Sequence, residues 1–194
     1  MKLQMIVVIL LTSLSISAQS KLNLIKSTPS VKQDVEKVAR DYFQNFNNVK
    51  GDTLLQTSGT IEFSSKIIPV GAVECSITKY SEPNSYSWQA TMLQTEDFKE
   101  AVSKYKQYYR QLNGANIAFY DKTTYKLTGN YDTPDEDRSF ASSILELEGK
   151  NHDLQLFKVE VALNFSFPQW SVKILVYEKI ADENMRPTLK VGDN

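Results

Sequence analysis

The sequence predicts an α+β fold, a two-layer sandwich in which two helices lie on one face of an antiparallel sheet. Two segments carry apolar residues at helical spacing, and several shorter segments alternate apolar and polar residues between clusters of turn formers. Because each helix has one apolar stripe and each strand one apolar face, a single shared core would bury both. Strands follow each helix, which suggests an α-βββ pseudo-repeat. Chance similarity between two amphipathic helices is the alternative explanation.

Composition sets the broad class of the protein. The chain has 194 residues, 41% of them hydrophobic, with a net charge of −1, one cysteine and one histidine. This apolar content is typical of a globular protein and argues against global disorder. Nucleic-acid binding depends on clustered Lys and Arg side chains that neutralise phosphates, so we expect no nucleic-acid partner.

The N-terminus has the pattern of a secretory signal peptide. A basic start precedes an apolar run over 5–14 and small residues over 15–19, which predicts a signal over 1–18 with cleavage after Ala18, or alternatively after Ser17 or Ser20. The apolar run is about half the length that crosses a membrane, so we expect no stable membrane span after cleavage. The layout resembles the signals of exported proteins from Gram-negative bacteria and implies a periplasmic or extracellular location.

The mature chain is expected to form one domain. A polar lead over 19–29 and a polar tail over 181–194 flank a single α+β domain over 30–180. Ser30 and Gln33 form a predicted capping box at the start of the first helix. Its apolar stripe consists of Val31, Val35, Val38, Tyr42 and Phe46.

Three strands are predicted next, at 61–63, 73–77 and 86–92. Their alternation leaves one polar face, rich in Ser, Thr, Gln and Glu side chains that could hydrogen-bond a ligand. The residues of this face are Glu74, Ser76, Thr78, Ser87, Gln89 and Thr91. Trp88 falls on the apolar face and is assigned to the core.

The second helix is predicted from Thr95 to Gly114. Its stripe consists of Phe98, Val102, Tyr105, Tyr109 and Leu112. Tyr108 should lie off this stripe and be partly exposed, because successive helical residues are 100° apart.

Further strands are predicted at 116–119, 124–131 and 140–147, and a hairpin follows. Apolar residues alternate from Val159 to Phe167, the chain turns at Pro168, and they alternate back from Trp170 to Val176. Trp170 is therefore also assigned to the core. A helix followed by an antiparallel meander is similar to cystatin-like folds and tandem-repeat inhibitors in arrangement alone, without a motif of either.

Few residues offer catalytic chemistry. Cys75 lies in phase with apolar neighbours and is interpreted as a small core residue, with a reactive thiol as the alternative. His152, beside Asp153 in a polar turn, is interpreted as a solvated histidine; a hydrolase would have to pair it with a distant nucleophile. The spacings that bind zinc, phosphates or dinucleotides are missing, and no cofactor is predicted.

Carboxylates gather at two places. Asp132, Asp135 and Asp137 form a weak candidate for a calcium site, without the spacing of an EF-hand, and an exposed acidic loop is the alternative. Glu146 and Glu148 lie two residues apart and would share a strand face, where solvation is a simpler interpretation than a catalytic pair.

These observations favour a non-catalytic binding or protein-interaction domain over an enzyme. Tyr108, Gln89 and Thr91 are the candidate ligand-binding residues, and the partner would be a protein or a small polar ligand. A small hydrolase with a carboxylate or His152 site is one alternative. The other is a carrier with an apolar pocket between helices and sheet, unless the rings that would line it fill the space. Those rings are Tyr42, Phe46, Trp88, Tyr105 and Trp170.

Overall fold

The residues that the structure describes form a nine-stranded antiparallel sheet and two α-helices. The computed structural model describes residues 30–82, 84–119, 122–149 and 154–179, and the predicted signal peptide, polar lead and polar tail lie outside them. The N-terminal half contains α1 (Val31–Asp41), a short 3-10 helix (Tyr42–Gln44), β1 (Lys50–Gln56), β2 (Thr60–Ser65), β3 (Glu74–Tyr80) and β4 (Ser85–Thr95). The C-terminal half contains α2 (Phe98–Leu112), β5 (Asn116–Ala118), β6 (Thr124–Thr128), β7 (Phe140–Leu147), β8 (Phe157–Ser166) and β9 (Gln169–Glu178).

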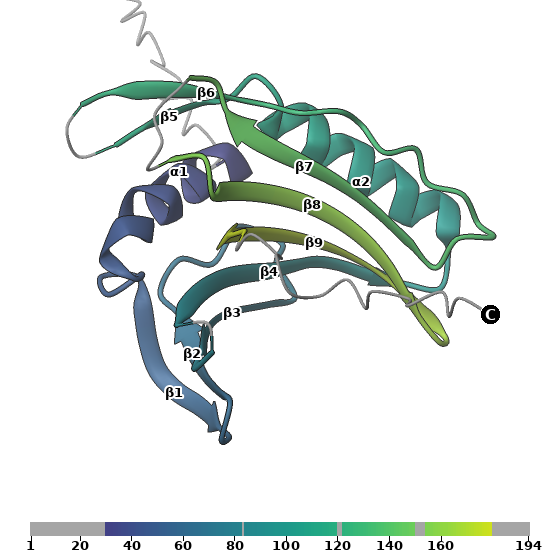
Figure 1. The fold of residues 1–194 in the computed structure, drawn as a ribbon. Helices are drawn as coiled ribbons and strands as arrows, with labels where there is room; N and C mark the ends of the chain where they lie inside the picture. The colour runs from purple at the N-terminus through teal and green to yellow at the C-terminus, as the bar shows by residue number, and fades with distance from the viewer. Residues whose placement is uncertain (1–29, 83, 120–121, 150–153, 180–194) are drawn as a thin grey trace, which may run out of the picture.

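The sheet is curved, and the two halves of the chain meet at its centre (Figure 1). Its strand order is β1-β2-β3-β4-β9-β8-β7-β6-β5, so the last strand of each half pairs with the other. Ala90 lies opposite Ile174 in this central pair. Four strands follow α1 and five follow α2, so neither half is a bare α-βββ unit.

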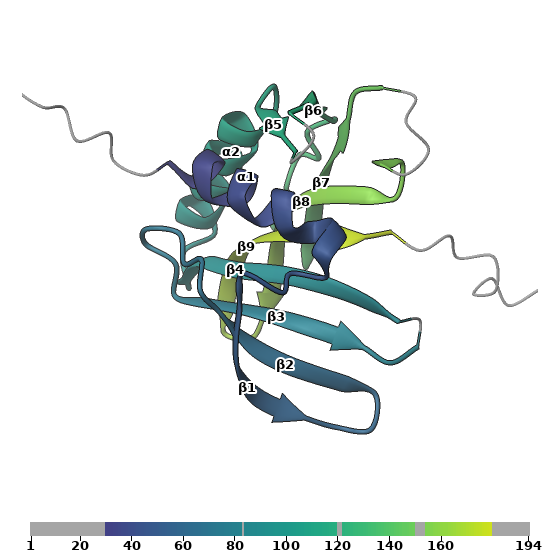
Figure 2. The same ribbon diagram turned by 90° about the vertical axis from the view of Figure 1, so that its left-hand side faces the viewer.

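Both helices pack on the same face of the sheet (Figure 2). Tyr42, just after α1, makes an edge-on ring contact with Phe157 of β8. In α2, the Tyr105 hydroxyl lies 2.6 Å from Ser143 Oγ, and Ser143 pairs with Val161 of β8. Phe157 and Val161 are four residues apart in one strand and therefore point to the same side. The predicted α+β arrangement, with the two helices on the antiparallel sheet, is confirmed.

The first helix is shorter than predicted. It ends at Asp41, and Asn45 and Phe46 take positive φ angles of 54° and 55°. The Asp41 carboxylate accepts hydrogen bonds from the backbone N–H groups of Asn48 and Val49, at 2.8 and 3.1 Å, which holds the chain in a turn. Ser30 is the N-cap but makes no side-chain cap bond, so the predicted capping box is wrong.

The second helix corrects the prediction for Tyr108. Asp97 caps the helix by accepting from the N–H groups of Lys99 and Glu100. The buried stripe is Ala101, Tyr105, Tyr108 and Leu112. Tyr108 is only 9% exposed, so the expectation that it would be partly exposed is wrong. The buried stripe contains Ala101 and Tyr108 where Val102 and Tyr109 were expected, because the side of the helix that carries the small Ala101 side chain lies against the sheet.

Strand β1 was missed by sequence analysis, whereas the strongest predicted hairpin is present. β1 lies at the edge of the sheet, and its Leu54 and Leu55 side chains are both exposed, so it lacks the alternation that identifies a half-buried strand. β8 and β9 form the predicted hairpin. Its tip extends beyond the core, which leaves Phe167 88% exposed.

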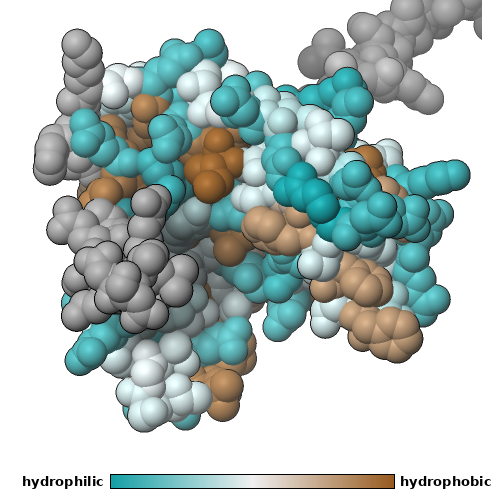
Figure 3. All heavy atoms as spheres, turned by 45° about the vertical axis from the view of Figure 1, so that its right-hand side comes forward, coloured by the Kyte–Doolittle hydropathy of each residue, from teal (hydrophilic) through white to brown (hydrophobic). Residues whose placement is uncertain are grey.

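Trp88 and Trp170 lie in the core, as predicted. The Trp88 indole N–H donates to Ser65 Oγ at 2.9 Å, so its polar group is satisfied inside the protein. Exposed apolar side chains form separate patches among hydrophilic ones on the side shown in Figure 3. Among the described residues, no helix is long and apolar enough to cross a membrane.

Candidate functional site

The face of the sheet opposite the helices, which we call the outer face, carries most of the polar strand residues. Trp88 of β4, Val161 of β8 and Ile174 of β9 point toward the helices. Successive strand residues point to opposite sides, so the residues next to each of these three point outward. Gln89 lies opposite Leu175, which lies opposite Glu160, so these three side chains form one row across the outer face.

The predicted ligand-binding residues do not come together. Gln89 and Thr91 lie on the outer face of β4, as expected, and Gln89 is half-buried. Thr91 is only 2% exposed, which leaves little of its surface for a ligand. Tyr108 is buried against the core on the helix side, where burial raises the pKa of its hydroxyl. The three residues therefore do not form one site.

A pocket of about 390 Å³ opens on the outer face among a different set of residues. It lies over β4, β8 and β9 and the end of β3, and we call it the Glu160 pocket. Its walls combine two tyrosine rings, hydroxyl groups, one leucine and the Glu160 carboxylate. Tyr86 and Glu178 also line it, but both alternate in phase with inward residues and direct their side chains to the helix side of the sheet. The lining residues are Tyr80, Ser85, Tyr86, Ser87, Glu160, Leu175, Tyr177 and Glu178.

Two hydroxyl groups hold the Glu160 carboxylate in place. Ser142 donates to Glu160 Oε1 at 2.5 Å, and Tyr177 donates to Oε2 at 2.8 Å. Burial, together with the charge of Glu160, raises the pKa of the Tyr177 hydroxyl above its ordinary value. Tyr177 therefore stays protonated and remains a hydrogen-bond donor to the carboxylate at neutral pH.

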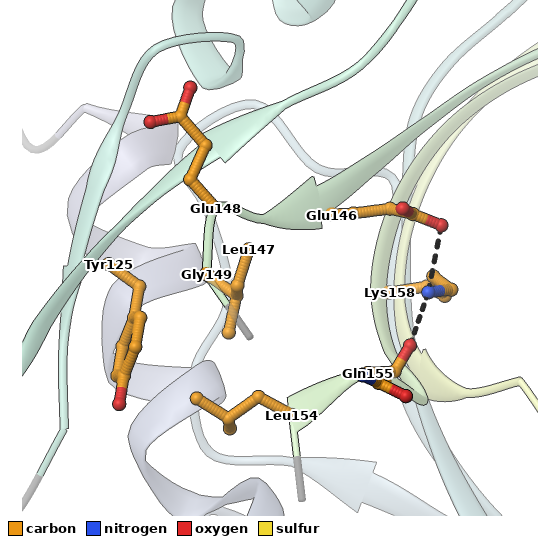
Figure 4. Close-up of a pocket in the computed structure, with 8 residues that line it drawn as sticks. All are labelled: Tyr125, Glu146, Leu147, Glu148, Gly149, Leu154, Gln155 and Lys158. Atoms are coloured by element: carbon orange, nitrogen blue, oxygen red, sulfur yellow. Dashed lines mark hydrogen bonds and ion pairs between the residues drawn. The ribbon is translucent and has the colours of Figure 1, made fainter. Parts of the chain in front are cut away.

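A second pocket, of about 290 Å³, lies among residues of β6, β7, the start of β8 and the segment between β7 and β8, and is called the Lys158 pocket (Figure 4). Lys158 is only 6% exposed. Its ammonium group lies 2.8 Å from Glu146 Oε1 and donates to the backbone carbonyl of Gln155 at 2.5 Å. The chain itself therefore compensates the charge of Lys158.

Glu146 and Glu148 do not form a carboxylate pair. Figure 4 shows Glu146 directed toward Lys158 and Glu148 pointing away from it. Glu148 instead lies 3.4 Å from Lys126 Nζ. Each carboxylate has a basic partner of its own, so the geometry of a glycosidase pair is not formed by these two residues.

The other predicted reactive groups are held in structural contacts or lie outside the described residues. Arg138 binds the Asp132 carboxylate at 3.0 Å and lowers its pKa, and Asp135 accepts from the Asp137 N–H. In the described part of the chain, no three His, Cys, Asp or Glu side chains are placed to hold a metal ion. His152 and Asp153 lie outside the described residues.

Cys75 and the predicted carrier rings pack inside the protein. Burial raises the pKa of the Cys75 thiol to about 11, and its Sγ lies 3.2 Å from the Ile67 carbonyl. Tyr42 is half-buried and makes edge-on ring contacts with Phe46 and Phe157, whereas the other four carrier rings are buried in the core. These rings contact core neighbours, and Tyr42 also lines a surface pocket of about 210 Å³.

Comparison with protein-family models, curated proteins and solved structures finds no match to this chain. The site must therefore be interpreted from its own chemistry.

Sequence reasoning missed Glu160 and Tyr177. Both lie at polar positions in the predicted final hairpin, so their outward direction was readable from the alternation. Their proximity depends on the register of β8 with β9 and on Ser142 from β7, which one strand's pattern does not reveal.

Proposed function

We propose that the protein is an exported, non-catalytic binding protein that holds a small ligand in the Glu160 pocket. The pocket itself is the observation that carries this proposal. Its volume of about 390 Å³ falls within the range of small-molecule sites, about 300–1,000 Å³. Convergent polar groups over an apolar floor, here Glu160 and Tyr177 beside Leu175, are the usual composition of such sites.

A binding role is favoured over catalysis by how the reactive groups are arranged. Lys158, Glu148 and Asp132 each have an oppositely charged partner within the chain. The raised pKa of the Cys75 thiol keeps it in its unreactive protonated form at neutral pH. Glu160 contacts hydroxyl groups that position it, and the tyrosine among them has a raised pKa that opposes proton transfer at neutral pH.

Fragment mapping by NMR tests the binding role. Fragments that bind are expected to shift the backbone amide signals of the Glu160 pocket. Ser87→Phe would fill the pocket and should abolish these shifts, whereas Ser171→Phe, on the same face outside the pocket, should retain them. Fragments that cluster at the Lys158 pocket instead, or that bind Ser87→Phe unchanged, would contradict the proposal.

Export is the second part of the proposal, and the N-terminal sequence supports it. Expression of the full chain in a Gram-negative bacterium, followed by mass spectrometry of the periplasmic protein, should give an N-terminus at Gln19. Retention of Met1 in a cytoplasmic protein would contradict export.

A protein-interaction domain is the second candidate function. The exposed phenylalanines at the β8–β9 end of the sheet favour it, namely Phe140, Phe165 and Phe167. Exposed aromatic side chains are enriched at protein interfaces. If this end binds a partner, Phe167→Ser should weaken that complex and leave the melting temperature of the free protein unchanged.

We also propose that the two halves of the chain are related by duplication. The arrangement that supports this is the meeting of β4 and β9, the last strands of the two halves, at the centre of the sheet. An alignment of homologous sequences in which the two halves match each other would test it.

A further inference from the structure

The Glu160 pocket contains negative charge that the described part of the chain does not neutralise. Both oxygens of Glu160 accept hydrogen bonds from neutral hydroxyl groups. Glu160 has no ion-pair partner among the described residues. None of the eight lining residues is basic. A partly buried carboxylate without a counter-ion attracts a cation more strongly than an exposed one, because water screens it less.

The lysines nearest along the two strands do not neutralise the pocket. Lys158 lies two residues before Glu160 on the same face of β8, but its ammonium group contacts Glu146 and Gln155. Lys173, two residues before Leu175 in β9, faces the same side and makes no ion pair with Glu160. The pocket therefore keeps its negative charge although basic residues lie on both neighbouring strands.

Aromatic rings are the second feature of the Glu160 pocket that favours a cation. Tyr80 and Tyr177 present rings to the pocket, and Tyr80 is 40% exposed at its rim. The Tyr86 ring points to the helix side of the sheet, where Lys50 and Lys79 lie 5.2 and 5.8 Å from its centroid. Tyr80 and Tyr177 are therefore the two rings that can contact a ligand in the pocket. The face of an aromatic ring attracts cations, and the two rings with Leu175 offer apolar contact to the body of a ligand.

We infer that the ligand of the Glu160 pocket is an organic cation, an ammonium or guanidinium group on a small apolar or aromatic body. This inference rests on the proposed binding function and names the class of ligand. Glu160 would accept hydrogen bonds from the N–H groups of the cation, the Tyr80 and Tyr177 rings would lie beside its charge, and Leu175 would contact the apolar part.

Three probes of matched size separate charge from shape. Phenethylamine is a cation at neutral pH, 2-phenylethanol is its neutral analogue, and phenylacetate is an anion. Each would be titrated into the isotope-labelled full chain while the amide signals of Glu160 and Tyr177 are followed by NMR. We expect phenethylamine to bind, to bind more weakly as salt is added, and to bind more tightly than either other probe.

Matched variants test whether the Glu160 carboxylate binds the phenethylamine cation. Glu160→Gln should weaken phenethylamine binding about tenfold or more, because it removes the partly desolvated charge opposite the cation. Glu74→Gln makes the same charge change on the exposed outer face of β3, away from the pocket, and should leave the affinity unchanged. Glu160→Ala removes the same charge and provides a second test if Glu160→Gln does not fold.

The outcomes distinguish the inference from the function on which it rests. If 2-phenylethanol or phenylacetate shifts the same signals with equal or greater affinity, the pocket is a binding site but the cation assignment is overturned. Unchanged phenethylamine affinity in Glu160→Gln or Glu160→Ala overturns the assignment as well. If no probe shifts the signals of Glu160 and Tyr177, both the assignment and the proposed function fail.

Discussion

Lys158 and Glu160 lie two residues apart in β8 and on the same face of the sheet, yet the chain treats their charges differently. Lys158 is nearly fully buried and contacts both a carboxylate and a backbone carbonyl. Glu160 is half-buried and contacts only neutral hydroxyl groups. The difference teaches that the position of a charged residue on a strand does not show whether its charge is structural or available to a ligand. The groups that contact the charge decide this.

Removing the partner of Lys158 should have the largest effect on stability. Glu146→Ala would leave the buried ammonium with only the Gln155 carbonyl. We expect the free energy of unfolding to fall by about 2 kcal/mol, because an uncompensated buried charge is costly. Urea denaturation measures this loss, and a change below about 0.5 kcal/mol would show that the pair contributes no more than an exposed one.

Removing the lysine itself should cost less. Lys158→Met keeps the apolar stem, and Glu146, whose side chain is 62% exposed, returns to water. We expect a loss of about 1 kcal/mol. The double variant Lys158→Met with Glu146→Ala should then be more stable than Glu146→Ala alone. Strict additivity of the two losses in this double-mutant cycle would contradict a coupled pair.

The matching change at Glu160 should barely alter stability. Glu160→Gln keeps an oxygen that accepts from Tyr177 and adds an amide that can donate to the Ser142 hydroxyl. We expect the free energy of unfolding to stay within about 0.5 kcal/mol of the unchanged protein. A loss as large as that of Glu146→Ala would mean that the Glu160 charge is structural.

Alkaline titration should show the smallest effect. Burial raises the pKa values of Tyr42, Tyr105 and Tyr177 above the ordinary value of about 10. The unfolded chain therefore loses these protons first as pH rises, so the stability they contribute is present below about pH 10 and is lost above it. Tyrosinate absorbance in Glu160→Gln should show Tyr177 titrating at lower pH, with a smaller change for Tyr105, since the Glu160 charge that raises both pKa values is gone. An unchanged curve would contradict the contact with Tyr177.

Elements with a strong apolar periodicity could be predicted from the sequence. Features that depend on contacts with other elements could not. Trp88 and Trp170 alternate with polar neighbours, so their burial was readable from the sequence. β1 was not predicted because Leu54 and Leu55 are adjacent and exposed at a sheet edge, so they do not alternate with polar residues. Tyr108 was misplaced because small Ala101 gave no strong signal for the side of the helix that contacts the sheet.

The candidate site was less predictable than the fold. The polar residues Lys158 and Glu160 alternate with valines, so their shared face followed from the pattern. Which of them would be neutralised depends on Glu146 of β7 and on the chain turn that brings the Gln155 carbonyl near. Such contacts join residues from separate segments, and their distances follow from strand register rather than from local spacing.

A crystal structure of the protein with phenethylamine tests the central claim most directly. We expect the ammonium group within hydrogen-bonding distance of the Glu160 carboxylate and the ring against Leu175. An ammonium group bound elsewhere, or a lysine of the chain in contact with the Glu160 carboxylate, would contradict the claim that this charge is available to a ligand.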